Sequence, residues 1–337
     1  MDAARLEDWM RQNVPGFRGP LAVEPISGGQ SNPTYRLLAP GGRYVLRRKP
    51  PGKLLPSAHA VDREFKVMKA LHGSDVPVPR VLALCSDESI IGTMFYLMEN
   101  VEGRVFYDPR LQEQSKAERA AMFDDMNRVI AALHRVDFAV IGLSDFGKPG
   151  NYFQRQIARW SQQYRASETE TIPAMDRLID WLPQNIPPGE ETSIVHGDFR
   201  MDNLIFHPAE PRVVAVVDWE LSTLGHPLGD FAYHAMTWRF TPELFRGLAG
   251  ADLAALGIPD EKAYVQAYCR RTNRAAIEHW DFYMGFVMFR MAAIFQGIMG
   301  RVRDGTATDA KAREAGAKAR PVAELGWQQV AHLAKAA

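Results

Sequence analysis

The chain has 337 residues, of which 46% are hydrophobic, and its 40 Lys and Arg residues balance its 40 Asp and Glu residues. This composition indicates a soluble globular protein with a large core, and the zero net charge gives no reason to expect nucleic acid or an anionic membrane as a partner. Two cysteines far apart in the sequence, Cys85 and Cys269, argue against a disulfide framework and favour a reducing cytoplasm.

A short helix and three strands are predicted at the N-terminus. Apolar residues share one face of a helix over residues 3–13, and this stretch has no continuous apolar run, so no signal peptide is expected. Apolar runs separated by turns then predict three strands of an antiparallel sheet, at residues 21–26, 34–39 and 43–49.

The first turn of this sheet, SGGQSNP at residues 27–33, is a candidate phosphate-binding loop. Gly28 and Gly29 let the backbone approach a ligand closely, and Gln30, Ser31 and Asn32 offer donors for phosphate oxygens. A Gly-Gly pair between strands is also common in a plain hairpin, so that alternative stays open. The chain contains no G-x-x-x-x-G-K-[ST] pattern, which excludes a Walker A loop.

The next segments are predicted as a helix over 58–72, a proline-containing loop that runs into a strand at 76–84, and a strand at 94–104 that ends in a glycine-containing link. Helical periodicity then predicts helices at residues 115–135, 151–166, 172–186, 229–240, 260–280, 280–300 and 321–335. Ser115 and Glu118 form a capping box at the first of these. Residues 304–320 are expected to be an exposed, mobile connection.

The most apolar helix, at 280–300, contains Arg290 and Gln296, so we expect a buried helix rather than a membrane span. Arg290 is the one charge in its apolar surroundings. It is either an anion site for a substrate or half of a buried ion pair with a carboxylate, and the pair is the favoured interpretation.

Residues 194–220 carry the strongest chemical pattern, IVHGDFRMDNLIFHPAEPRVVAVVDWE. His196, Asp198 and Asn203 stand in the spacing H-x-D-x-x-x-x-N, and Asp218 follows twenty positions after Asp198. Phosphoryl transfer needs a carboxylate that accepts a hydroxyl proton and two oxygen ligands for magnesium. Asp and Asn in loops are often simple turn formers, but the full ordered set is a more demanding pattern.

The segments HGDFRMDN and VVDWELSTLGHPLGD resemble the corresponding motifs of the aminoglycoside phosphotransferase and choline kinase group, small-molecule relatives of the protein kinases. The resemblance implies an α+β, two-lobed protein-kinase-like fold with a nucleotide cleft between the lobes. The N-lobe, residues 1–100, would hold an antiparallel β-sheet, and the C-lobe, residues 101–337, would be mostly helical.

The same resemblance implies a role for each residue of the motif. Asp198 is the catalytic base, His196 supports the loop through its ring, and Asn203 and Asp218 hold Mg²⁺ across the nucleotide phosphates. Glu220 is expected on the same side of a strand as Asp218, close to a second metal.

The third strand of a protein kinase carries V-A-I-K, and its lysine holds the nucleotide phosphates. In the matching register this chain has Arg47, which we expect to pair with Glu64 and to reach the phosphates. Alternatively, Glu64 is an ordinary solvated helix carboxylate. The backbone of the hinge, formed by Met98, Glu99, Asn100 and Val101, is expected to bind adenine.

Two further charged residues accompany the motif. Asp230 is expected at a helix start near Gly229, as a structural anchor that braces the catalytic loop. Arg200, inside the loop, contacts substrate or has a structural role.

These residues together indicate a Mg²⁺-dependent kinase that transfers the γ-phosphate of ATP or GTP to a hydroxyl of a small metabolite. The alternatives are a kinase-like module that binds nucleotide without turnover and, last, a metal-dependent hydrolase. RRKPPGKLLPSAHAVDREFKVMKAL and VVDWELSTLGHPLGDFAYH resemble the kinase-like segment ahead of some long acyl-CoA dehydrogenases, over about residues 20–300. This resemblance implies a hydroxyacyl or acyl-CoA-related acceptor, and a free-standing chain without a dehydrogenase domain.

Overall fold

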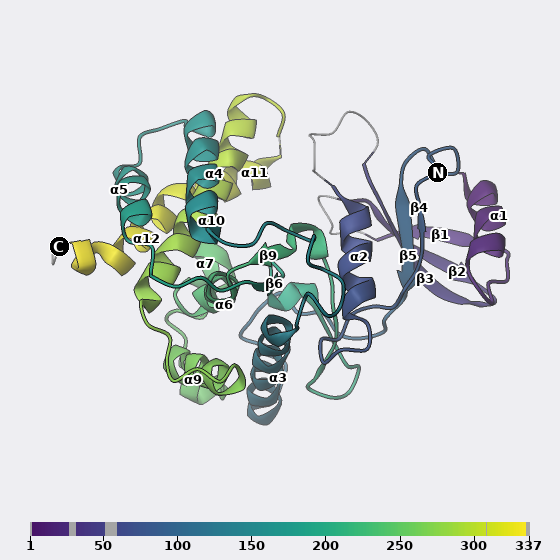
Figure 1. Cartoon of the computed structure of the whole chain (residues 1–337), viewed down its shortest axis with the longest axis horizontal. Helices are drawn as coiled ribbons and strands as arrows, with labels where there is room; N and C mark the ends of the chain where they lie inside the picture. The colour runs from purple at the N-terminus through teal and green to yellow at the C-terminus, as the bar shows by residue number, and fades with distance from the viewer. Residues whose placement is uncertain (1, 27–31, 51–58, 308, 335–337) are drawn as a thin grey trace. The chain divides into compact units, whose positions relative to one another are not determined.

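The computed structural model describes residues 2–26, 32–50, 59–307 and 309–334 (Figure 1). The chain forms two compact units. The first comprises Met1–Val105, Val136–Phe146 and Asp202–Ser222, and the second comprises Phe106–Arg135, Gly147–Met201 and Thr223–Ala337. The division predicted at residue 100 lies close to Val105, but two later segments also belong to the first unit.

The first unit is built on a five-stranded antiparallel sheet with the strand order β1-β2-β3-β5-β4. Its strands are β1 (Ala22–Pro25), β2 (Thr34–Ala39), β3 (Gly42–Arg48), β4 (Val81–Cys85) and β5 (Phe95–Glu99). Helices α1 (Ala3–Asn13) and α2 (Val61–Leu71) lie on opposite sides of these strands in Figure 1. The predicted N-terminal strands and both helices are confirmed.

The two faces of this sheet carry different side chains, because successive side chains along each strand point to opposite faces. Leu46 of β3 and its cross-strand neighbour Leu97 face α1, where they are fully buried against Leu6 and Met10. Burial of one such leucine contributes about 1.5–3 kcal/mol. The opposite face therefore carries Arg47, and this is the face that meets α2.

A second hairpin belongs to the first unit and ends in the acidic part of the motif. Strands β7 (Leu204–Phe206) and β8 (Val213–Val216) pair antiparallel. Asp218 follows with a left-handed backbone, φ +66°, and Trp219–Leu221 form a short 3₁₀ turn. The prediction that the strand continues through Glu220 is therefore wrong, because the left-handed backbone of Asp218 turns the chain sharply.

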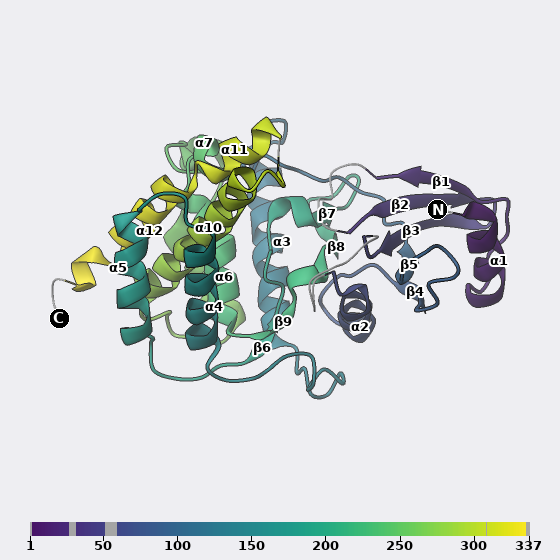
Figure 2. The ribbon, with the colours of Figure 1, turned by 90° about the horizontal axis from the view of Figure 1, so that it is seen from above.

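The second unit is mainly helical (Figure 2). Its longer helices are α3 (Lys116–Arg135), α4 (Tyr152–Ser167), α5 (Pro173–Trp181), α6 (Pro227–Ala235), α9 (Glu261–Arg271), α10 (Trp280–Arg303), α11 (Ala310–Gly316) and α12 (Ala319–Ala334). The short helices α7 (Pro242–Phe245) and α8 (Leu253–Leu256) and the strand pair β6 (Ser193–Val195) and β9 (Thr223–Gly225) complete it. Helix α10 packs against α4, α11 and α12.

Helix α10 is long and apolar enough to cross a membrane by length and composition, but 78% of its most apolar window is buried inside the protein. The prediction of a buried helix is confirmed. The capping box of α3 is also present, since the N–H of Glu118 donates to Ser115 Oγ at 3.3 Å and the N–H of Ser115 donates to Glu118 Oε2 at 3.1 Å.

Several predicted helix limits are wrong. The connection expected at 304–320 contains α11, whose alanine-rich sequence favours helix and whose start is capped by Asp309. Helix α5 ends at Trp181, shortly before Pro183, and α9 ends at Arg271 rather than near residue 280. Helix α6 begins at Pro227, two residues before Gly229, because proline suits the first helical position.

Candidate active site

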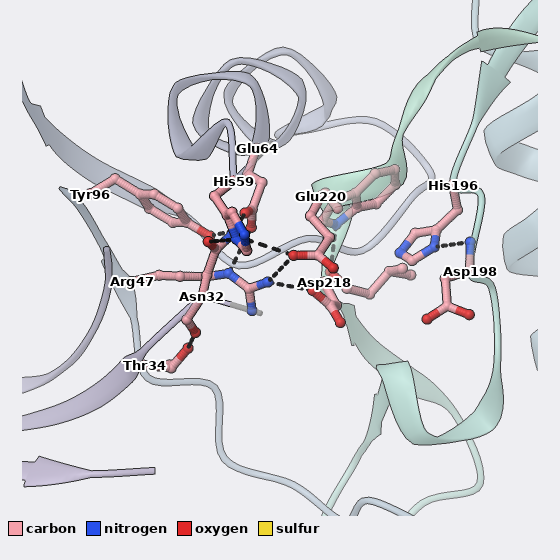
Figure 3. A network of polar contacts seen from close by, with 12 residues as sticks. Asn32, Thr34, Arg47, His59, Glu64, Tyr96, His196, Asp198, Asp218 and Glu220 are labelled. Carbon is pink, nitrogen blue, oxygen red and sulfur yellow. Dashed lines mark hydrogen bonds and ion pairs between the residues drawn. The ribbon is translucent and has the colours of Figure 1, made fainter. Parts of the chain in front are cut away.

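Arg47 is the centre of a charged cluster in the first unit (Figure 3). Its Nε lies 2.9 Å from Glu64 Oε2, while its Nη2 contacts a carboxylate oxygen of Asp218 and lies 3.4 Å from Glu220 Oε2. The structure thus pairs Arg47 with Glu64, as the strand register predicts. The same guanidinium also reaches Asp218, the predicted magnesium ligand.

Besides Arg47, two other residues hold the carboxylate of Glu64. Tyr96 Oη donates to its Oε2 at 3.1 Å, and Asn32 Nδ2 donates to its Oε1 at 2.7 Å. The residue is only 1% exposed. Glu64 is therefore not the solvated helix carboxylate of the alternative interpretation.

Three carboxylates converge on the single guanidinium of Arg47, so the cluster is rich in negative charge. Burial, and then the neighbouring carboxylates of Asp218 and Glu220, raise the pKa of Glu64 to about 7, although Arg47 acts in the opposite direction. An excess of carboxylate oxygens over cations suits the binding of a divalent cation, which adds the missing positive charge.

The raised pKa of Glu64 predicts how stability depends on pH. Between the ordinary value of 4.5 and about 7, the folded chain keeps a proton on Glu64 that the unfolded chain has released. The free energy of unfolding should therefore fall as the pH rises through this window. In Glu64→Gln, which cannot ionise at this position, the fall should be smaller by roughly 1–3 kcal/mol.

Urea unfolding of both proteins at about pH 5 and about pH 7.5 measures this difference. Asp62→Asn, which changes an exposed carboxylate on the same helix, is the matched control and should keep the wild-type pH dependence. Equal pH dependence in wild type and Glu64→Gln would contradict the assignment.

Asn203 and Asp218 are brought together by the β7–β8 hairpin. The C=O of Asn203 accepts the N–H of Val217 at 2.9 Å, which ties the residue before β7 to the residue before Asp218. Carboxylate and amide oxygens are the ligands that Mg²⁺ takes in proteins. Among the residues that the structure describes, no group of three or more His, Cys, Asp or Glu side chains converges as a metal site. Asn203 and Asp218 are the residues that could hold a magnesium ion here.

Asn32 is buried and joins the charged cluster. Besides Glu64, its amide contacts Glu220 Oε2 at 3.4 Å and His59 Nδ1 at 3.0 Å. The side-chain donor expected to face a phosphate is thus directed at carboxylates instead. The other predicted loop residues, Gly28, Gly29 and Ser31, lie outside the described residues.

A groove of about 640 Å³ lies on the sheet face that carries Arg47. Arg36 and Leu38 line it, and the register places them on that face, opposite Val45 and Arg43. The hinge residues that line it are Asn100 and Val101.

The four predicted hinge residues, Met98–Val101, differ in what their backbone offers. The N–H of Glu99 donates to the C=O of Arg80 at 2.9 Å, and the N–H of Asn100 donates to the C=O of Arg43 at 3.4 Å. Met98 is a buried residue of β5. Within the described chain, the N–H of Val101 makes no such hydrogen bond to another backbone group.

The second unit carries Asp198. Arg200 Nη2 donates to Asp198 Oδ2 at 3.0 Å, and Tyr233 Oη donates to Asp198 Oδ1. The ring of His196 is fully buried, and its Nδ1 accepts the N–H of Asp198 at 3.2 Å. The geometry fits the supporting role predicted for His196.

Asp230 anchors the start of this loop. Its two oxygens accept the N–H groups of His196 and Gly197, each at 2.8 Å, and His134 Nε2 lies 3.2 Å from Oδ2. Tyr268 Oη holds the other ring nitrogen of His134 at 2.7 Å. Burial raises the pKa of Asp230, but His134 and the N–H donor of His196 outweigh it and hold the pKa below its ordinary value. The expected structural anchor is present.

Arg290 has no carboxylate partner among the described residues, so the predicted ion pair is wrong. In the described part of the chain its Nη2 donates to the C=O of Gly197 at 2.8 Å, and its guanidinium lies over the rings of Tyr233 and Trp160. Two aromatic faces and a carbonyl supply the partial negative charge that a carboxylate would otherwise provide.

Sequence reasoning missed three residues of this region: His59, Tyr96 and Tyr233 are not among the predicted site residues. Only Tyr233 had a usable signal, because it follows Asp230 by three positions and so shares its face of α6. The other two make long-range contacts that no spacing reveals.

Comparison with known proteins identifies the family. The profile described as the phosphotransferase enzyme family matches residues 22–268. The chain belongs to this phosphotransferase family. Its fold is accordingly the protein-kinase-like fold of aminoglycoside phosphotransferases, as predicted.

Two acyl-CoA dehydrogenase family members support this assignment. Acyl-CoA dehydrogenase family member 10 of Mus musculus is 48% identical over 92% of this chain, and member 11 of Rattus norvegicus is 43% identical over 97%. The chain spans only 29% and 43% of these two relatives. The predicted resemblance to their kinase-like segment is confirmed.

Solved structures agree with this result. A Ralstonia eutropha JMP134 protein, described provisionally as an aminoglycoside phosphotransferase, is 59% identical, with a TM-score of 0.92 over 98% of each chain. A thermostable mutant of aminoglycoside phosphotransferase APH(4)-Ia, in ternary complex with AMP-PNP and hygromycin B, matches with a TM-score of 0.63 over 96% of this chain and 98% of that one. At 17% identity the second structure shows the shared fold alone.

Proposed function

We propose that this phosphotransferase is a Mg²⁺-dependent kinase that transfers the γ-phosphoryl group of ATP or GTP to a hydroxyl of a hydroxyacyl or acyl-CoA-related metabolite. The observation that carries the proposal is the contact of Arg47 with both Glu64 and Asp218, because it joins a phosphate-binding cation to a metal-binding carboxylate. The proposal also rests on family membership.

The nucleotide would bind along the sheet face that carries Arg47. The base would occupy the groove beside Val101, whose N–H would donate to an acceptor nitrogen. Arg47 supports the phosphates, since a guanidinium binds two oxygens at once. Relatives with the same fold bind AMP-PNP or ADP, which supports an adenine nucleotide here as well.

Asn203 and Asp218 would hold Mg²⁺, which neutralises charge on the transferred phosphoryl group when bound. Asp198 accepts the proton of the acceptor hydroxyl. The acceptor oxygen forms a bond to the γ-phosphorus, the bond to the bridging oxygen breaks, and ADP or GDP leaves with that oxygen.

The surroundings of Asp198 favour an anionic acceptor. Two guanidinium groups lie close to it, because Arg200 contacts its carboxylate and Arg290 binds the neighbouring C=O of Gly197. Cationic groups suit phosphate or carboxylate groups, whereas a polycationic aminoglycoside needs carboxylates. This charge supports the acyl-CoA-related acceptor over an antibiotic.

The alternative function, a module that binds nucleotide without turnover, has less support. Tyr233 and His196 hold Asp198, and Asp230 anchors its loop. A protein that only bound nucleotide would not need a carboxylate held in this way.

A thermal-shift screen tests the proposal. The melting temperature should rise with MgATP or MgGTP more than with either nucleotide alone, and rise again when a hydroxyacyl-CoA is added with MgADP. Kanamycin with MgADP is the cationic comparison and should give no further rise. No shift with either nucleotide would contradict the proposal, and a shift with kanamycin but not with hydroxyacyl-CoA would overturn the acceptor class.

A further inference from the structure

The hydroxyl of Tyr233 has a specific partner in the second unit. Tyr233 lies on α6 and donates its hydrogen to Oδ1 of Asp198. The side chain is only 4% exposed, and a buried hydroxyl without a partner would be costly. Burial raises the pKa of Tyr233, and the neighbouring carboxylate of Asp198 raises it further, so the phenol remains a donor.

The ring of Tyr233 is fixed by Arg290. The guanidinium carbon of Arg290 lies 5.1 Å from the centroid of the Tyr233 ring, and the same guanidinium donates to the C=O of Gly197 at 2.8 Å. One buried cation therefore holds both the tyrosine and the loop next to Asp198. Rotation of the ring away from Asp198 would break this desolvated cation–π contact.

Arg200 and Tyr233, which both contact Asp198, differ in how readily a substrate can replace them. Arg200 contacts both oxygens of Asp198, with Nη2 3.0 Å from Oδ2 and Nε 2.8 Å from Oδ1, but its side chain is 24% exposed. Tyr233 is almost completely buried. An incoming hydroxyl can therefore take the place of Arg200 at Oδ2, whereas Tyr233 keeps Oδ1.

We propose that Tyr233 is the positioning residue for the base: its hydroxyl holds Oδ1 of Asp198, so that Oδ2 is presented to the acceptor hydroxyl. This inference rests on the proposed function of Asp198 as base. Without the phenol, the carboxylate gains rotational freedom and spends less time in the productive orientation, which lowers the rate of transfer without changing nucleotide binding.

The test compares Tyr233→Phe, which keeps the ring and loses the hydroxyl, with Tyr164→Phe, which changes a buried tyrosine of α4. The acceptor is unidentified, so the activity probe is MgATP alone, with water as phosphoryl acceptor and ADP formation as the readout. Tyr233→Phe should lower kcat about tenfold with a KM for MgATP within about twofold of wild type. Tyr164→Phe should match wild type in both.

A second readout needs no turnover. In protein labelled with ¹³Cζ-tyrosine, the Tyr233 resonance is the one missing from Tyr233→Phe, and it should move in Asp198→Asn because the charged acceptor is lost. A Tyr233 resonance that is indifferent to Asp198→Asn, or a wild-type kcat in Tyr233→Phe, would overturn the positioning role. Full activity in Asp198→Asn together with a shifted resonance would instead contradict the proposed base.

Discussion

Replacing Asp198 with Asn is expected to lower turnover by roughly 10²–10⁴, the usual contribution of a general base. The amide cannot accept the proton of the acceptor hydroxyl, yet it retains the size of the carboxylate and can still accept from Tyr233. Since Asp198 lies in the second unit and the nucleotide contacts are assigned to the first, the affinity for MgATP should remain close to that of wild type.

Two measurements check this result: steady-state ADP formation and calorimetric titration with MgATP. Asp202→Asn is the matched control, because it changes a second carboxylate of the same loop to which no role as base is assigned. Unchanged turnover in Asp198→Asn would remove Asp198 from its assigned role, and an equal loss in Asp202→Asn would point to a disturbed loop.

Replacing Arg47 with Ala is expected to weaken both MgATP binding and turnover, because the phosphates lose their cation. Arg47→Lys should be tolerated in part, since lysine keeps the charge but not the fork that reaches Glu64 and Asp218 together. Arg48→Ala is the matched control and should do little. Arg48 points to the other face of β3, where it contacts the C=O of Ile91 and the ring of Tyr35.

Loss of Arg47 also leaves Glu64 buried without its cation, and breaking a buried pair costs about 3–5 kcal/mol of stability. The double variant Arg47→Ala with Glu64→Gln separates this effect from binding, because it removes the unpaired charge. Stability should recover in the double variant while MgATP affinity stays low. Wild-type affinity in Arg47→Ala, with a loss in Lys49→Ala instead, would place the phosphate clamp elsewhere.

Much of this site follows from local patterns in the sequence. The alternation of side chains along β3 places Arg47 on the face opposite Leu46, and the resemblance to protein kinases names Glu64 of α2 as its partner. The motif around Asp198 has a fixed order, so its members could be named by number. A carboxylate after the motif could likewise be assigned as an anchor, and Asp230 is one.

The remainder depends on tertiary contacts or on single backbone angles. The left-handed conformation of Asp218 turns Glu220 out of the expected strand. Aspartate adopts such an angle more often than most residues, but local sequence does not reveal at which aspartate the chain turns. Tyr96 joins Glu64 only because β5 pairs with β3. Arg290 contacts two aromatic rings and a carbonyl instead of the expected carboxylate. These partners depend on tertiary packing, which the local sequence does not reveal.

Kinase activity toward a hydroxyacyl-CoA is measured by the transfer of label from [γ-³²P]ATP to that acceptor by the wild-type chain with Mg²⁺. A Mg²⁺-dependent kinase with Asp198 as its base should form a labelled phosphate ester, and this product should require Mg²⁺ and be lost in Asp198→Asn. Label that appears only as inorganic phosphate with every hydroxyacyl-CoA tried would contradict the acceptor class. The absence of any label transfer or release by a chain that binds MgATP would contradict the assignment as a kinase.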